Sequence, residues 1–148
     1  MLAVHWLIVA WALGIVVSDV SSRRIPNAFS LGAVVCGLAY LAYFSHAVLN
    51  GSLVDVLLGV LLALLLTVPA YMMSWLGAGD VKLLLAIASL GGWQSVLTSF
   101  AVAGLLGAVC ALAVMQYATY SGQAPARKRW VPFGAMLAAG LIVSMGFR

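Results

Sequence analysis

The sequence predicts an all-α, polytopic membrane protein with about six transmembrane helices. Of its 148 residues, 66% are hydrophobic and only 7% are charged, whereas a soluble domain carries about a quarter charged residues. This composition excludes an ordinary cytosolic globular protein and also a disordered chain. A span takes roughly 20 apolar residues, so six spans use about 120 and leave no room for a water-soluble domain. We therefore expect residues 1–148 to form one integral-membrane domain.

Three apolar runs, separated by short polar stretches, are expected to form the first three spans: residues 2–18, 28–49 and 53–73. The first run has neither a basic start nor a small-residue cleavage site, so it is expected to be a retained helix rather than a signal peptide. It ends at Asp19. Asn50-Gly51-Ser52 is the expected turn between the second and third spans, and Pro69 is expected to kink the end of the third.

The second half of the chain contains one apolar run, 81–90, that is too short for an ordinary span. Ten residues reach only about 15 Å as a helix, which is half the thickness of the hydrocarbon. The run could form a short or tilted span that turns at Gly91-Gly92, or a re-entrant half-helix. A long apolar run, 93–117, follows it, and a last span is expected over 131–147.

The basic residues favour two spans within 81–117, because cytoplasmic loops are enriched in lysine and arginine. With two spans, six of the seven basic residues lie on one face and only Arg148 lies on the other; with one, the cluster at 127–129 lies opposite Arg23 and Arg24. We therefore predict six helices with both termini on the non-cytoplasmic side. The seven residues are Arg23, Arg24, Lys82, Arg127, Lys128, Arg129 and Arg148.

The chain has only three acidic residues, Asp19, Asp55 and Asp80. Two spans separate Asp19 from Asp80, and an even number of crossings returns the chain to the same face, so both are expected at the cytoplasmic border. If the helices that carry them pack together, the two carboxyl groups can share a proton. One can then activate water while the other polarises a peptide carbonyl. Asp55 lies near the outer face and is interpreted as a helix N-terminal charge or an interface anchor.

Gly77 and Gly79 precede Asp80, and glycine permits unusual backbone conformations and the close approach of a second backbone. The same tetrapeptide also fits a loop that caps a helix, with the aspartate favoured by the helix dipole. A second aspartate on the same face favours the catalytic interpretation. A rival class is a small proton- or cation-coupled transporter subunit, in which Asp55 would continue a chain of acids across the membrane.

Three segments, in this order, resemble motifs of the type IV prepilin peptidases, which are Gly-x-Gly-Asp intramembrane aspartyl proteases: residues 19–27 (DVSSRRIPN), 77–83 (GAGDVKL) and 130–140 (WVPFGAMLAAG). The resemblance implies that Asp19 and Asp80 are the catalytic pair. It also implies that the substrate is a prepilin or pseudopilin, whose short basic leader is removed at the cytoplasmic face of the inner membrane. We expect the substrate's apolar segment to enter from the bilayer.

The chain lacks the paired cysteines of bifunctional family members, so it resembles the short tight-adherence (Flp pilus) type without a methyltransferase region. A non-catalytic pilus assembly partner is a third interpretation. The resemblance also implies that residues around the two aspartates shape the site, and we expect no metal or cofactor, no nucleic acid, and prepilin and membrane lipid as partners. Lys82 either tunes the charge of the pair or marks the cytoplasmic border. The shaping residues are Pro26, Asn27, Gly77, Gly79, Lys82, Pro132 and Gly134.

Overall fold

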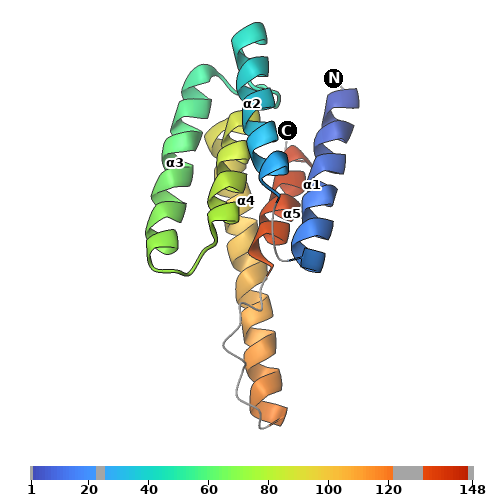
Figure 1. Cartoon of the computed structure of the whole chain (residues 1–148), viewed down its shortest axis with the longest axis vertical. Coiled ribbons are helices and arrows are strands. Elements are labelled where there is room, and N and C mark those ends of the chain that lie inside the picture. The colour runs from blue at the N-terminus through green and yellow to red at the C-terminus, as the bar shows by residue number, and fades with distance from the viewer. Residues whose placement is uncertain (1, 23–25, 122–131, 147–148) are drawn as a thin grey trace.

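The computed structural model describes residues 2–22, 26–121 and 132–146, and all regular structure in these ranges is α-helical (Figure 1). Four of the helices are long and apolar enough to cross a membrane, which confirms an all-α, polytopic membrane protein. The fifth, α5, is apolar but has only 14 residues. The helices are α1 (Leu2–Ser22), α2 (Asn27–Phe44), α3 (Leu53–Met72), α4 (Ala78–Ser121) and α5 (Phe133–Gly146).

Helix α4 consists of two arms, residues 78–91 and 93–121, which meet at Gly92 with φ 73° and ψ −166°. The first arm runs back along α3, because the short connection 73–77 joins their ends and Gly92 returns to Asp55 at the start of α3. The second arm reverses again and extends well beyond the other helices (Figure 1). The chain therefore turns at Gly91-Gly92, as one of the two sequence interpretations expects, and the residues that the structure describes form six helical segments.

The turn at Gly92 is packed tightly against the start of α3. A Cβ atom at Gly92 would lie 2.9 Å from the Cβ of Asp55. Asp55 forms a reciprocal capping box with Ser52, in which each residue's side chain accepts the other's backbone N–H, and its Oδ1 accepts a hydrogen bond from the indole N–H of Trp93 at 3.1 Å. The prediction that Asp55 is a helix N-terminal charge is confirmed, and the same carboxylate holds the residue that follows the turn.

Helix α4 is the central helix of the bundle, because it packs against α2, α3 and α5, and α5 in turn packs between α4 and α1 (Figure 1). A Cβ atom at Gly140 would lie 2.6 Å from the backbone Cα of Ser99, so the two helices touch through their backbones. Small residues permit this close approach between helices in lipid. The core around α5 has fully buried side chains from three helices: Ile15, Leu83, Leu84, Ile87, Leu137 and Leu141.

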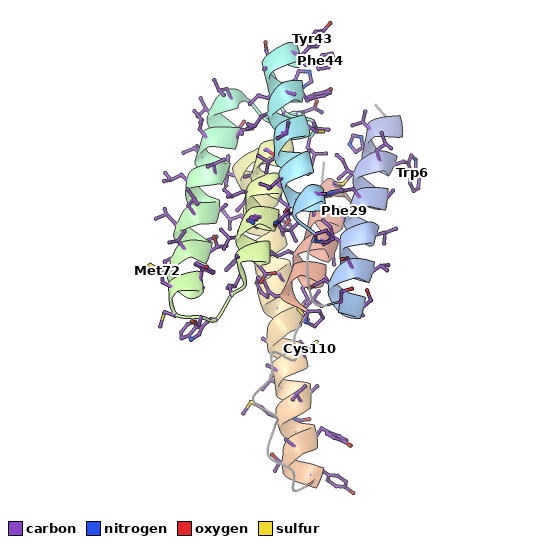
Figure 2. The ribbon with its side chains drawn as sticks, viewed as in Figure 1. Trp6, Phe29, Tyr43, Phe44, Met72 and Cys110 are labelled. Atoms are coloured by element: carbon purple, nitrogen blue, oxygen red, sulfur yellow. The ribbon has the colours of Figure 1, made fainter. Side chains whose placement is uncertain are left out.

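Many large apolar side chains are exposed on the outer surface of the bundle, as expected for a protein that is solvated by lipid. Trp6, Tyr43 and Met72 all point away from the bundle (Figure 2). Exposed leucines follow one another along the outer face of α3, at Leu57, Leu61 and Leu65 among others. In water such a surface would be an aggregation site, so the surface supports the membrane location that the composition predicts.

Several helix boundaries differ from the prediction; α4, for example, begins at residue 78 instead of 81 and ends at residue 121 instead of 117. Helix α1 continues to Ser22 instead of ending at residue 18, so Asp19 lies inside the last turn of a helix. Helix α2 ends at Phe44 instead of residue 49, because Ser45 adopts the left-handed conformation with φ 61°. Apolar residues continue through this loop, where the backbone N–H of Leu49 donates to the carbonyl of Leu90 at 2.9 Å. Hydropathy indicates that a segment is buried, not that it is helical.

Candidate active site

Asp19 is buried at the end of α1, with only 7% of its surface exposed. Its Oδ2 accepts a hydrogen bond of 2.8 Å from the backbone N–H of Ala135, 116 residues further along the chain. Ala135 is the third residue of α5, so this N–H belongs to the first turn, which has no acceptor inside its own helix. A carboxylate is favoured there by the helix dipole as well. Asp19 therefore acts as an N-terminal cap for a helix to which it does not belong.

The residues just before Ala135 form the start of α5, as the sequence predicts for them. Pro132 immediately precedes the helix, and its carbonyl accepts the backbone N–H of Met136 at 3.3 Å. Gly134 is buried and directly precedes Ala135, whose N–H binds Asp19. The ring of Phe133 meets the ring of Phe100 edge-on, with 6.1 Å between the ring centroids. The segment therefore fixes the end of α5 that receives the carboxylate of Asp19.

Asp80 is the third residue of α4, and its Oδ2 accepts the backbone N–H of Gly77 at 3.0 Å. The carbonyl of Gly77 in turn accepts the backbone N–H of Asp80 at 3.1 Å. The tetrapeptide Gly77–Asp80 thus forms the capped start of a helix, and its carboxylate remains only partly buried. Among the described glycines, a positive φ occurs at Gly92 alone. Gly77 and Gly79 therefore have no positive φ, and Gly79 leaves one position of the first turn of α4 without a side chain.

Lys82 connects the start of α4 to the start of α2. Its Nζ donates a hydrogen bond of 2.9 Å to Oδ1 of Asn27. Pro26 is the N-cap of α2, and its carbonyl accepts the backbone N–H of Phe29 at 3.0 Å. Pro26 and Asn27 form the turn into the second helix, as predicted. The hydrogen bond between Lys82 and Asn27 was not predicted. Among the basic residues of the topology prediction, those at 23, 24, 127–129 and 148 lie outside the described residues.

The end of α1, which carries Asp19, and the start of α4, which carries Asp80, lie at the same end of the bundle (Figure 1). The bond from Ala135 to Asp19 joins the end of α1 to the start of α5, and the bond from Lys82 to Asn27 joins the starts of α4 and α2. Asp55 lies at the opposite end, beside the turn at Gly92. However, α1 packs mainly against α5 and not against α4. The two helices that carry the aspartates, α1 and α4, therefore both pack against α5 and not mainly against each other.

Sequence reasoning missed Ala135, because a backbone N–H can be donated by almost any residue type. The available signal is Pro132, since a proline before an apolar run marks a helix start. The free N–H groups of the first turn then require an acceptor. In a chain with three acidic residues, Asp19 was one of few candidates for that acceptor.

A multi-pass helical protein with two carboxylates at one end of its bundle has the architecture of a membrane-embedded aspartic peptidase. A sequence model of the type IV leader peptidase family matches residues 6–112, and the chain belongs to this family. It is therefore an aspartic-type prepilin peptidase of the inner membrane. Comparisons with curated proteins and with solved structures find no match. The matched region contains both Asp19 and Asp80 and ends before α5.

The bond between Lys82 and Asn27 should be measurable as a coupling between the two residues. We expect Lys82→Met and Asn27→Ala each to lower stability, and the double variant to lose less than the sum. Hydrogen bonds between membrane helices average about 0.6 kcal/mol in such cycles, so a coupling of this size is expected. Unfolding of the four proteins in mixed micelles measures it. Strictly additive losses would show that the contact contributes nothing.

Proposed function

We propose that Asp19 and Asp80 are the catalytic pair and that the enzyme removes the leader from Flp-type prepilins at the cytoplasmic face of the inner membrane. The observation that supports the pair is its placement: each carboxylate accepts a backbone N–H at a helix N-terminus, and both helices begin at one end of the bundle. The third carboxylate, Asp55, is bound in a capping box at the other end.

The chemistry requires one charged and one protonated aspartate. The charged member takes a proton from a water molecule, whose oxygen attacks the carbonyl carbon of the scissile peptide bond. The protonated member donates a hydrogen bond to the carbonyl oxygen as this oxygen becomes negative. The tetrahedral intermediate then collapses, the carbon–nitrogen bond breaks, and the leaving amine takes up a proton from the pair. One new carboxyl end and one new amino end result.

The positions of the two helix starts contribute to this reaction. The positive N-terminal ends of α4 and α5 both point toward the carboxylate end of the bundle, where negative charge develops in the transition state. The hydrogen bond from Ala135 holds Oδ2 of Asp19 in place. We propose that the other oxygen, Oδ1, faces the water or the substrate. A base whose orientation is fixed before the reaction loses less entropy in the transition state.

Six spans with both termini on the non-cytoplasmic side fit this arrangement. The six helical segments alternate in direction, and α1 begins at the end of the bundle opposite to the two carboxylates (Figure 1). Lys82, the basic residue that the structure describes, lies at the carboxylate end. Cytoplasmic segments are enriched in such residues, which supports a cytoplasmic position for the pair.

Cleavage by the purified enzyme in proteoliposomes tests the proposed substrate. An Flp-type prepilin and a long type IV prepilin are supplied separately, and mass spectrometry identifies the new N-terminus of each. We expect the Flp-type protein to lose its leader faster than the long one. A faster reaction with the long prepilin would contradict the Flp assignment. Absence of any cleavage, together with a proton or cation flux that depends on Asp55, would instead support a transporter.

A further inference from the structure

An apolar groove of about 460 Å³ lies between α1 and α2. The two helices follow each other in the chain but pack against different neighbours, since α1 contacts α5 and α2 contacts α4. This divergence leaves the space between them open. Its walls carry Leu7, Ile8 and Trp11 from α1 and Phe29, Gly32 and Cys36 from α2. Charged side chains do not occur among the described residues that line it.

The groove leads to the carboxylate end of the bundle. Its walls meet at their lower end, where the indole N–H of Trp11 donates to the carbonyl of Phe29 at 3.1 Å, and Phe29 points toward α1 (Figure 2). From Trp11, α1 continues for two turns to Asp19. The other wall, α2, begins at Asn27, which is bound by Lys82 two residues after Asp80. The wall formed by α1 thus continues to Asp19, and the wall formed by α2 begins at the hydrogen-bond partner of Lys82.

On the basis of the proposed function, we propose that this groove binds one face of the apolar helix of the prepilin. A helix turn about 10 Å wide and 5.4 Å long fills roughly 420 Å³, so the groove holds part of a helix. The charges of the enzyme and of the substrate also match along the groove. Uncharged walls face the apolar segment of the substrate, and the two aspartates lie where the short basic leader begins.

Gly32 offers a way to fill the groove without disturbing the bundle. A Cβ atom at Gly32 would have no other atom within 4 Å, so the side chain of Gly32→Leu projects into the groove. The matched control is Gly104→Leu on the second arm of α4, where a Cβ atom also meets nothing within 4 Å. Both variants replace a helical glycine by the same better helix former, and only the first blocks the groove.

Two substrates separate a binding defect from a loss of the peptidase itself. One is the full-length Flp-type prepilin, and the other is a short peptide that spans the leader junction and lacks the apolar helix. We expect Gly32→Leu to raise the KM for the prepilin at least about tenfold, with kcat and peptide cleavage unchanged and Gly104→Leu like the wild type. An unchanged KM would overturn the groove proposal. Failure of the wild-type enzyme to cleave either substrate would overturn the proposed function instead.

Cys36 identifies the occupant directly, because this exposed thiol lies on the wall of the groove. In a Cys110→Ala background, Cys36 is the single cysteine of the enzyme. Oxidation with copper phenanthroline is carried out in membranes that contain prepilins with one cysteine placed along the apolar helix. We expect a mixed disulfide at positions on one face of that helix. An enzyme dimer linked through Cys36 would show a second copy in the groove, and no adduct would indicate lipid; either result overturns the proposal.

Discussion

Asp19→Asn and Asp80→Asn are each expected to lower the rate of prepilin cleavage by about a thousandfold or more. Asparagine can neither take a proton from water nor donate the proton of a carboxyl group, and general acid–base catalysis alone contributes about 10²–10⁴-fold. Because the two groups act as a unit, the double variant should be hardly slower than either single variant. Initial rates of leader removal from purified prepilin, followed as a mobility shift on gels, measure the effect.

Two further variants distinguish catalysis from folding. Asparagine at position 19 still offers an oxygen to the N–H of Ala135, whereas Asp19→Ala removes the cap of α5 and should cost about 1 kcal/mol or more of stability. Asp55→Asn alters a carboxylate that caps α3 at the opposite end of the bundle, so it should keep its cleavage activity. Wild-type cleavage by either Asp19→Asn or Asp80→Asn would show that the pair is assigned wrongly.

Gly92→Ala is expected to destabilise the protein by about 3 kcal/mol. Its φ of 73° and ψ of −166° fall in a region that only glycine adopts readily, and forcing another residue into such a region costs about 1–3 kcal/mol. The new methyl group would also lie 2.9 Å from Cβ of Asp55 and 3.0 Å from its backbone. Overpacking of this kind adds about 1–3 kcal/mol. Unfolding by sodium dodecyl sulfate in mixed micelles measures the loss.

The control for this prediction is Gly104→Ala on the second arm of the same helix. A Cβ atom there meets nothing within 4 Å, and alanine favours a helix over glycine by up to about 1 kcal/mol. We expect this variant to be as stable as the wild type or slightly more stable. Equal stability of Gly92→Ala and Gly104→Ala would mean that the turn at Gly92 is not fixed by the backbone of α3.

Much of the fold could be predicted from hydropathy, because membrane helices must satisfy their own backbone hydrogen bonds. The turn at Gly91-Gly92 was one of two predicted alternatives, since two adjacent glycines interrupt an apolar run. The order of packing could not be predicted. Apolar side chains indicate burial in lipid or protein alike. The contact that places α5 against α4 depends on Gly140, which has no side chain and so lets the backbone of Ser99 come close.

The candidate site was predictable where it depends on counting crossings. Two spans separate Asp19 from Asp80, so these residues lie at one end of the bundle. One span separates Asp19 from Asp55, so Asp55 lies at the other end. The contacts themselves were not predictable. The N–H of Ala135 has no characteristic residue type, and the bond between Lys82 and Asn27 spans 55 residues. The assignment of Asp19 and Asp80 as the catalytic pair stays a prediction.

The shortness of two helical segments has a consequence for the surrounding lipid. The first arm of α4, residues 78 to 91, and α5 each have 14 residues, which corresponds to about 21 Å. The hydrocarbon is roughly 30 Å thick, and a short span is accommodated by thinning of the bilayer around it. Both short segments begin at the carboxylate end. The membrane is therefore expected to dip toward the two aspartates, so that water reaches a peptide bond at a depth where an undeformed bilayer would be dry. In thicker membranes this deformation costs more, which couples the rate of leader removal to the lengths of the acyl chains.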